Sequence, residues 1–370
     1  MIATVLGTRP ELIKTAPVIH ELRRRGAAHA LVHTGQHYTP TLDEVFFREL
    51  DLPAPEVNLR VGSLPAPEQV ARIVVGVAEA LRAISPRLVL VQGDTNSVLG
   101  GALAAHKLGI PIAHLEAGLR SDDWSMPEEG NRVLAGRVAA MHLCPTAAQA
   151  ARLAREGITR GVYVVGNTVV DASLQFGKRA RERSTILRKL ELDVTPFALL
   201  TLHRPSNVDE PGRLRRLLEG LAETARLRGI QLVFPIHPRT LHKARDAGLQ
   251  GLLDAGPFRT VDPLGYLDLL ALVQRSEVVL TDSGGLQEEA CTLHVPCVTL
   301  RPNTERPETV EVGANLLCDS DDATELARTV AVSCCRARDW VNPFGDGHAS
   351  QRVVDLMLDR SINLSPSGQP

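Results

Sequence analysis

Three carboxylates in the first half of the chain have the right chemistry for proton transfer. They are Asp94 in "QGDTNS", Glu116 in "HLEAGLRS" and Glu128 in "SMPEEGNR", and each follows a separate segment. Removing a proton from carbon and returning it requires a base and an acid with tuned pKa values. Burial and mutual repulsion among clustered carboxylates supply that tuning. The pattern predicts an acid–base site. The structural alternative is that Asp94 caps a helix beginning at Asn96 and that Glu128 begins a helix after Pro127.

The segment "EVVLTDSGGLQEEA" combines an apolar run, two glycines and a helix-like continuation. A strand, a Ser-Gly-Gly turn and a helix start present free backbone N–H groups at the positive end of a helix dipole, which suits a phosphate. Gly284 and Gly285 let the backbone approach an anion with no Cβ in the way. Glu289 follows one helical turn later and could accept hydrogen bonds from a ribose. The alternative is that Ser283 is only an N-cap and that the acids only complement the dipole.

Basic residues occur at two comparable turns. Arg301 and Arg306 lie in the proline-containing stretch "RPNTERPETVEVGAN", and Arg9 and Lys14 lie in "LGTRPELIKTAPVI". Arginine can bind phosphate oxygens with two parallel hydrogen bonds, so these turns are candidates to neutralise a diphosphate. Arginines on ordinary surface loops are the alternative interpretation.

Two histidines each follow an apolar run in the second half of the chain, His203 in "LTLHRPSN" and His237 in "FPIHPRT". Either could contact phosphate or act as an acid near neutral pH. Their spacing lacks the short His/Cys pairing of metal sites, so no metal is expected. The sequence contains neither a GxGxxG stretch after its first apolar run nor a Walker loop, which disfavours a nicotinamide cofactor.

The elements that must position these residues alternate between short aliphatic runs and amphipathic helical stretches. One series starts at "MIATVLGTRP" and a second at "FALLTLHRP". Such alternation favours parallel sheets covered by helices on both faces, and ligands bind such sheets beyond the carboxyl ends of the strands. Nine polar residues follow the apolar runs directly: Arg9, Gln36, His37, Asp94, Glu116, His203, His237, Asp282 and Ser283.

Length and composition limit the classes of protein. A chain of 370 residues predicts two domains, which we place at residues 1–170 and 171–360, with a disordered tail at 361–370. The last helix of the second domain could pack back against the first domain. We expect two doubly wound α/β domains facing each other across a cleft. With 44% hydrophobic residues and a net charge of −2, neither nucleic acid nor a membrane is an expected partner. Six cysteines without a CxxC pair, and an N-terminus unlike a signal peptide, predict a reducing cytoplasm and inert thiols.

Together these segments resemble the non-hydrolysing UDP-N-acetylglucosamine 2-epimerase family, whose architecture is called GT-B. The resemblance runs in order from "GTRPELIKTAPVI" through "TGQHY", "GDTNSVLGGALAA", "HLEAGLRS", "MPEEGNR", "HRPSN", "HPRT", "TDSGGLQEEA" and "TERPE" to "NPFGDGHAS". It implies reversible conversion of UDP-GlcNAc to UDP-ManNAc without a cofactor. In this reaction the C2 proton and UDP are lost to give a 2-acetamidoglucal, and UDP then adds again. A homodimer is also implied.

The resemblance assigns roles to individual positions. Asp94, Glu116 and Glu128 become the acid–base residues, and His203 joins them as a catalytic residue. The resemblance implies that UDP and the sugar are bound by Arg9, Lys14, Arg132, His237, Leu269, Ser283, Gly284, Gly285, Glu289 and Arg306. Within that set, Glu289 would take the ribose hydroxyls and the Ser-Gly-Gly turn would take phosphate.

Some positions depart from the family pattern. Pro205 and Ser206 stand where relatives often carry Arg and Glu, and Leu269 stands where many place Phe near the uracil. "QHY" replaces the "QHR" of members that UDP-GlcNAc activates, and it resembles archaeal-type and sugar-acid-active members. Glu11 and "TERPE" favour plain UDP-GlcNAc as the substrate. A hydrolysing epimerase, an epimerase of a modified UDP-GlcNAc, a GT-B glycosyltransferase and an inactive sugar-nucleotide sensor are the alternatives.

Overall fold

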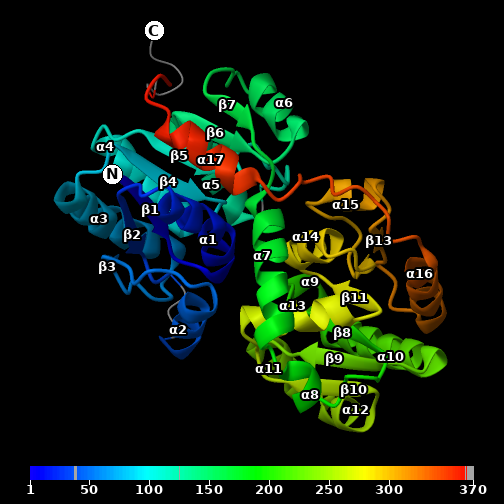
Figure 1. The fold of residues 1–370 in the computed structure, drawn as a ribbon. Helices are drawn as coiled ribbons and strands as arrows, with labels where there is room; N and C mark the ends of the chain where they lie inside the picture. The colour runs from blue at the N-terminus through cyan, green and yellow to red at the C-terminus, as the bar shows by residue number, and fades with distance from the viewer. Residues whose placement is uncertain (37–39, 125, 363, 365–370) are drawn as a thin grey trace. The chain divides into compact units, whose positions relative to one another are not determined.

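The chain folds into two α/β units, each with its own parallel sheet (Figure 1). The computed structural model describes residues 1–36, 40–124, 126–362 and 364. Unit 1 consists of Met1–Ala172 and Phe344–Pro370, and unit 2 consists of Ser173–Pro343. The predicted fold class, two doubly wound α/β domains, is confirmed by the two sheets.

The sheet of unit 1 has the strand order β3-β2-β1-β4-β5-β6-β7, and all its pairings are parallel. The central strands are runs of aliphatic residues that are buried on both faces, as parallel sheets require. The register places Ile2 of β1 opposite His29 of β2 and Leu88 of β4. The strands are β1 Ile2–Leu6, β2 His29–His33, β3 Val57–Asn58, β4 Leu88–Gln92, β5 Ile112–Leu115, β6 Met141–Cys144 and β7 Val162–Val164.

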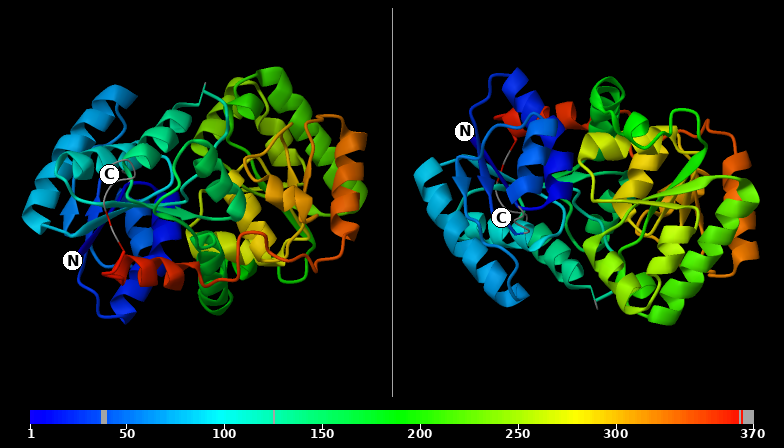
Figure 2. Two further views of the ribbon diagram at one scale, coloured as in Figure 1. Left: turned by 90° about the horizontal axis from the view of Figure 1, so that it is seen from above. Right: turned by 90° about the horizontal axis from the view of Figure 1, so that it is seen from below.

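Helices cover both faces of this sheet (Figure 2). On one face α3, α4 and α5 pack over a core that includes Ile73, Val98 and Ala135. On the other face α1 and α17 pack together over Ile2 and Leu90. The helices of unit 1 are α1 Arg9–Arg24, α2 Pro40–Glu49, α3 Ala66–Ile84, α4 Asn96–Lys107, α5 Pro127–Val138, α6 Ala147–Arg155 and α17 Ala349–Leu358, and α7 Thr168–Arg183 begins in this unit.

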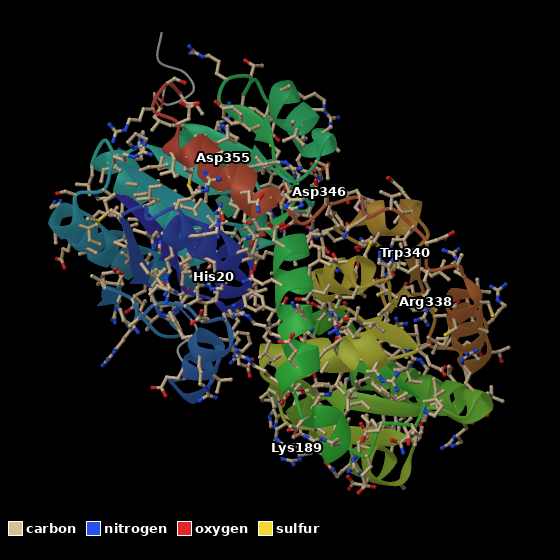
Figure 3. The ribbon with its side chains drawn as sticks, in the orientation of Figure 1. His20, Lys189, Arg338, Trp340, Asp346 and Asp355 are labelled. Atoms are coloured by element: carbon tan, nitrogen blue, oxygen red, sulfur yellow. The ribbon has the colours of Figure 1, made fainter. Side chains whose placement is uncertain are left out.

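The return segment, which starts at Phe344, belongs to unit 1. On α17, Asp355 accepts a hydrogen bond from Arg25 Nη2 at 2.7 Å, and Asp346 before the helix pairs with Arg352 (Figure 3). Val353, Val354 and Met357 complete the apolar core beneath α1. Unit 2 ends before α17, whereas the second domain was expected at residues 171–360 with a last helix that could pack against the first domain. The predicted tail at 361–370 lies mostly outside the described residues.

The sheet of unit 2 has the order β10-β9-β8-β11-β12-β13 and is also parallel throughout. Its strands are β8 Phe197–Thr201, β9 Gln231–Pro235, β10 Phe258–Val261, β11 Val278–Thr281, β12 Cys297–Thr299 and β13 Asn315–Leu317. Its helices are α8 Ile186–Lys189, α9 Pro205–Val208, α10 Pro211–Arg228, α11 Pro238–Asp246, α12 Gln250–Ala255, α13 Tyr266–Arg275, α14 Gly284–Thr292, α15 Pro307–Glu311 and α16 Ala323–Cys335.

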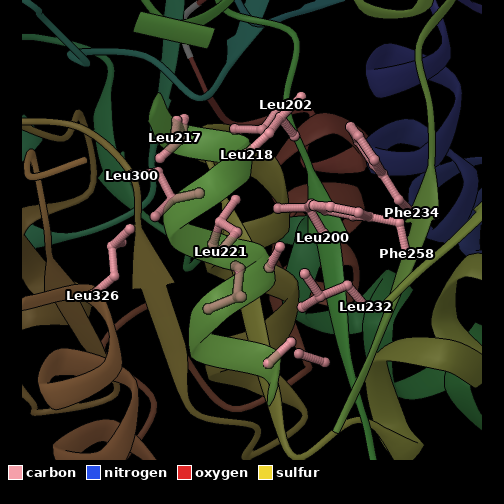
Figure 4. Packing of buried hydrophobic residues seen from close by; sticks show 14 of the residues in the cluster. Leu200, Leu202, Leu217, Leu218, Leu221, Leu232, Phe234, Phe258, Leu300 and Leu326 are labelled. Atoms are coloured by element: carbon pink, nitrogen blue, oxygen red, sulfur yellow. The ribbon is translucent and has the colours of Figure 1, made fainter. Parts of the chain in front are cut away.

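A leucine-rich core fills the space between α10, α16 and this sheet (Figure 4). Leu217, Leu218 and Leu221 recur at helical spacing on α10 and pack with Leu200 of β8 and Leu326 of α16. This core holds the strand ends of unit 2 in place.

Both sheets reverse their strand order beside the first strand of the series. In unit 1, β1 lies between β2 and β4, and in unit 2, β8 lies between β9 and β11. Ligands of doubly wound sheets bind at this switch point, beyond the carboxyl ends of the strands. The loops after β1, β4, β8 and β11 are therefore the expected location of a ligand site.

The cysteines for which inert thiols were expected are mostly buried. Of the six cysteines, Cys144, Cys291, Cys297 and Cys318 are buried free thiols, and burial raises the pKa of Cys144 and of Cys291 to about 12. Such thiols are inert as nucleophiles. Across the part of the chain that the structure describes, every helix is too short or too polar to span a bilayer.

Candidate active site

Glu116 follows β5, and side chains from different parts of unit 1 donate hydrogen bonds to its carboxylate. Lys14 Nζ of α1 donates to Glu116 Oε1 at 2.5 Å, and Asn167 Nδ2 donates to the same oxygen at 3.1 Å. Gln92 Nε2, at the end of β4, donates to Oε2. Glu116 is 7% exposed, so an ammonium and two amides compensate its charge with little contribution from water.

The backbone around Glu116 is strained in a way that functional sites often are. Glu116 has a φ of +65°, which a residue with a side chain seldom adopts. Gly93 has a φ of +84°, and a Cβ at this glycine would lie 3.7 Å from Glu116 Oε2. His114 Nε2 lies 2.8 Å from the Gly93 carbonyl oxygen. Burial lowers the pKa of His114 to about 4, so its ring is neutral and Nε2 donates this bond. The ends of β4 and β5 are thereby fixed to each other.

Asp94, two residues after the end of β4, is bound by Arg132 of α5. Arg132 donates to Asp94 Oδ2 from Nε at 2.9 Å and from Nη2 at 2.7 Å. Arg132 Nη1 also donates to Glu129 Oε2 at 2.7 Å. Thr95, and not Asp94, is the N-cap of α4, since Thr95 Oγ1 accepts from Val98 N at 3.4 Å. The alternative of a helix-capping Asp94 is therefore wrong.

Two adjacent glutamates in the first turn of α5 have opposite environments. Glu128 is exposed, whereas Glu129 is 1% exposed. Glu129 accepts from Ser121 N and Oγ at 2.9 Å each and from Asp122 N at 3.2 Å, in addition to Arg132. Burial alone would raise the pKa of Glu129, but these hydrogen bonds outweigh it and lower the pKa. Sequence reasoning selected Glu128 and missed Glu129.

The turn after β1 is organised by Glu11. Its Oε2 accepts from Gly7 N at 2.6 Å and from Thr8 N at 2.8 Å, and its Oε1 accepts from Thr95 Oγ1. Burial raises the pKa of Glu11 to about 7 despite these donors. Arg9 in the same turn is half-buried, with its guanidinium carbon 5.5 Å from the centre of the Phe46 ring.

In unit 2 the ends of β8 and β11 meet at Asp282. Asp282 is fully buried and accepts from His203 N, Arg204 N and Asn207 Nδ2. His203 Nδ1 lies 2.9 Å from Asp282 Oδ1. Burial tends to raise the pKa of Asp282, but His203 and the backbone donors lower it. A buried carboxylate on one ring nitrogen orients a histidine and fixes its tautomer, which leaves the other nitrogen to face a substrate.

His237 begins the next turn along the sheet. Its Nδ1 accepts from Arg239 N at 3.2 Å as the N-cap of α11. The His203 and His237 ring centres lie 6.3 Å apart. The structure thus brings together the two histidines that the sequence placed after separate strands.

The Ser-Gly-Gly turn forms the start of α14 as predicted from the sequence. Ser283 is at the N-cap position but makes no side-chain capping bond, so capping does not account for it. A Cβ at Gly284 would lie 3.7 Å from Glu305 Oε2, and one at Gly285 would meet nothing within 4 Å. Both glycines thus border open space at a helix N-terminus.

Glu289 is buried on α14 beside Tyr266 of α13. Burial first and the nearby Glu289 second raise the pKa of Tyr266 well above its usual value. Leu269, one turn further along α13, is half-buried. The structure therefore positions the predicted ribose-binding carboxylate inside the unit, next to a phenol.

Arg306 and Arg301 each bind a glutamate of unit 2. Arg306 Nε donates to Glu288 Oε1, and Arg301 donates from Nη1 and Nη2 to Glu305 at 2.9 Å each. Burial would raise the pKa of Glu305, but Arg301 lowers it to about 2. Both arginines are therefore held by carboxylates close to the α14 turn and are not extended into solvent.

The predicted residues thus form two groups, one in each unit. Unit 1 gathers Lys14 with Glu116 and Asp94 with Arg132, while Arg9 and Glu128 make none of these bonds. Unit 2 gathers His203 with His237 at one turn and Ser283, Gly284 and Gly285 at another. His37 and Tyr38 of "QHY" lie outside the described residues. Gln92, Asn167 and Glu129 were missed, because an uncharged amide in a strand or loop, and one of two adjacent acids, give no distinctive sequence signal.

Comparison with known proteins identifies the same relatives by sequence and by structure. A family described as UDP-N-acetylglucosamine 2-epimerase matches residues 20–358. UDP-N-acetylglucosamine 2-epimerase of Methanocaldococcus jannaschii is 44% identical over 96% of this chain and 98% of its own length. The UDP-2,3-diacetamido-2,3-dideoxy-D-glucuronate 2-epimerase of Pseudomonas aeruginosa is 38% identical over 96% of this chain and 99% of its own length. A crystal structure of the M. jannaschii enzyme in complex with UDP-GlcNAc and UDP has a TM-score of 0.88, covering 96% of this chain and 99% of the other.

Proposed function

The chain belongs to the UDP-N-acetylglucosamine 2-epimerase family, and from that premise we propose that it interconverts UDP-GlcNAc and UDP-ManNAc reversibly without net hydrolysis. The reaction would proceed by elimination and re-addition of UDP. A base takes the proton from C2, and the C2–H electron pair forms a C1=C2 double bond. UDP leaves with the electron pair of the C1–O bond. Proton return to the opposite face of C2 and renewed attack by UDP complete the epimerisation.

The observation that supports this chemistry most is the pair of carboxylates at the ends of neighbouring strands, each bound by a cation. Glu116 is bound by Lys14, and Asp94 is bound by Arg132. A carboxylate held in a defined orientation can act as the general base that takes a proton from carbon. We assign proton transfer at C2 to Asp94, Glu116 and Glu128, and we assign His203 to the leaving UDP, supported by its buried partner Asp282.

We assign UDP itself mainly to unit 2. The Ser283 hydroxyl and the backbone N–H groups of Gly284 and Gly285 would bind phosphate at the start of α14, and Arg306 and His237 would add positive or hydrogen-bonding groups. Glu289 would accept from the ribose hydroxyls, and Leu269 would contact the uracil. In unit 1, Arg9, Lys14 and Arg132 would complete the set around the diphosphate and the sugar. The relative with 44% identity that binds UDP-GlcNAc and UDP in its crystal structure supports this ligand class.

Turnover of UDP-GlcNAc in deuterium oxide, followed by proton NMR, tests the proposal. We expect UDP-ManNAc with deuterium at C2, together with exchange at C2 in the recovered UDP-GlcNAc. Free ManNAc and UDP as the main products would instead identify a hydrolysing epimerase. Substrate recovered without exchange would contradict epimerase activity altogether.

A modified UDP-GlcNAc is a second candidate substrate, favoured by the 38% identity to the Pseudomonas enzyme that is named for a diacetamido glucuronate. The two candidates differ at sugar C3 and C6. Parallel assays with UDP-GlcNAc and with UDP-2,3-diacetamido-2,3-dideoxy-glucuronate would separate them by kcat/KM. Turnover of the glucuronate alone would replace our assignment, and turnover of UDP-GlcNAc alone would establish it.

A further inference from the structure

Asn167 is a buried amide that the proposed reaction does not use, yet it contacts one of its carboxylates. Its side chain is 2% exposed, and Nδ2 donates to Glu116 Oε1 at 3.1 Å. The same amide serves a second element, because Oδ1 accepts from Val169 N at 3.1 Å. Since α7 begins at Thr168, this is the hydrogen bond of an N-cap.

The backbone of Asn167 is hydrogen-bonded to the return segment of unit 1. Asn167 N donates to the Phe344 carbonyl oxygen at 2.8 Å. A Cβ at the preceding Gly166, whose φ is +91°, would lie 3.2 Å from that oxygen. Asn167 therefore joins three features within unit 1: the Glu116 carboxylate, the start of α7, and residue 344, where the chain re-enters the unit.

From these contacts we infer that Asn167 is a positioning residue for Glu116, which fixes its carboxylate relative to the start of α7 and the return segment. It does so with one amide, whose N–H holds the carboxylate while its oxygen caps the helix. This inference rests on the proposed function only in calling Glu116 an acid–base residue. The positioning itself is independent of the reaction.

The groups around Glu116 determine how the removal of the Asn167 side chain would change the pKa of Glu116. The charged or titratable neighbours of this carboxylate include Lys14 from α1 and His114 from β5, and Gln92 from β4 is an uncharged donor. Asn167 donates to Oε1, the oxygen that Lys14 also contacts. Loss of a donor to a carboxylate disfavours its charged form, so the Glu116 pKa rises.

Asn167→Ser separates the two roles of the side chain. Serine is a favoured N-cap and can still accept from Val169 N, while the backbone bond to Phe344 is unchanged. It has no group that reaches Glu116. Asn167→Asp also keeps the cap but places a second carboxylate against the first, so it should raise the Glu116 pKa further.

Asp171→Asn is the matched control. Asp171 is buried on α7, four residues after Asn167, and accepts from Ala349 N at 3.2 Å and from Ser350 N at 2.8 Å. Its replacement disturbs the same junction between α7 and the return segment. It leaves the donors Lys14, Gln92 and Asn167 in place.

The direct readout is the titration of the Glu116 carboxyl carbon by ¹³C NMR in protein labelled at glutamate Cδ, with the resonance assigned by Glu116→Gln. We expect the midpoint to rise by about one pH unit in Asn167→Ser, and further in Asn167→Asp. In Asp171→Asn it should move by less than about 0.3 unit. An unchanged midpoint in both Asn167 variants, or an equal rise in Asp171→Asn, would overturn the inference.

The kinetic readout connects this positioning to the proposed function. Asn167→Ser should lower kcat about tenfold with little change in KM, because the residue touches Glu116 and is not assigned to substrate. One limb of the pH profile of kcat should move to higher pH by the same amount as the NMR midpoint. A wild-type protein that does not epimerise would refute the proposed function while the NMR comparison still decides the inference.

Discussion

At the scale of single residues, Glu128 and Glu129 show how burial separates two side chains of identical chemistry. Both lie in the first turn of α5, where the helix dipole stabilises an acidic side chain. Glu129 alone is enclosed, with donors from Ser121, Asp122 and Arg132. Glu129 therefore organises the structure through Arg132, which also holds Asp94, while the exposed Glu128 remains accessible to a substrate.

Substituting each glutamate by glutamine should have opposite consequences. Glu129→Gln loses charge-assisted bonds in a buried network, so we expect the free energy of unfolding to fall by about 2 kcal/mol. Glu128→Gln should change it by less than about 0.5 kcal/mol. In contrast, Glu128→Gln should lower kcat by about 100-fold if Glu128 transfers a proton. Urea denaturation and epimerase assays of the two variants measure both effects, and equal losses of stability would contradict the assignment.

Glu11 should make stability depend on pH in the unusual direction for a carboxyl group. Its pKa is raised from 4.5 to about 7, so the folded state binds more protons than the unfolded state between these values. The contribution of Glu11 to the free energy of unfolding is therefore fully present below about pH 4.5 and is lost as pH rises through 7. Glu11→Gln lacks this loss, so its stability relative to the wild type should improve from pH 5 to pH 8, by up to about 3 kcal/mol.

Urea denaturation at both pH values measures this difference. Glu68→Gln is the control, because Glu68 forms an exposed pair with Arg72 and should matter little at either pH. A stability difference for Glu11→Gln that is the same at pH 5 and pH 8 would show that Glu11 titrates normally.

At the scale of elements, the start of α14 contains two glycines that the fold itself does not require. Gly284 and Gly285 lie in the first turn of the helix, and a Cβ at either would meet no atom closer than 3.7 Å. A glycine in a helix costs about 1 kcal/mol relative to alanine. The backbone exposure that glycine provides is consistent with a role in binding an anion.

Gly285→Ala should therefore stabilise the protein and weaken its binding of UDP. We expect the free energy of unfolding to rise by about 0.5–1 kcal/mol, and the UDP dissociation constant to rise about tenfold or more, as titration calorimetry would measure. Gly251→Ala on α12 is the matched control, since its Cβ would also meet nothing within 4 Å. It should stabilise similarly and leave UDP binding unchanged. Unaltered UDP affinity in Gly285→Ala would remove the α14 turn from the phosphate site.

At the scale of the whole molecule, periodicity and strand–helix alternation were enough to predict two parallel sheets, because most buried strands are short, mainly aliphatic runs. The strand ends then indicated Asp94, Glu116, His203 and Ser283. Periodicity could not decide which of two adjacent acids is buried on α5. It also could not reveal that Asn167, 51 residues after Glu116, donates to it. Such contacts depend on how distant segments pack, and an uncharged amide gives no signal of that packing.

The division of the chain between the units can be tested by the way in which local stability responds to cavities. Met357 of α17 is 1% exposed and packs with Ile2, Val18 and Leu22, so Met357→Ala should cost about 2–4 kcal/mol within unit 1. Hydrogen exchange should then accelerate in β1 and α1 and remain unchanged in β8 and β11. Leu326→Ala, which opens the core beneath α10, should produce the reverse pattern. If Met357→Ala instead accelerated exchange in the sheet of unit 2, the last helix would belong energetically to that unit, and the two sheets could not be treated as separately stabilised bodies.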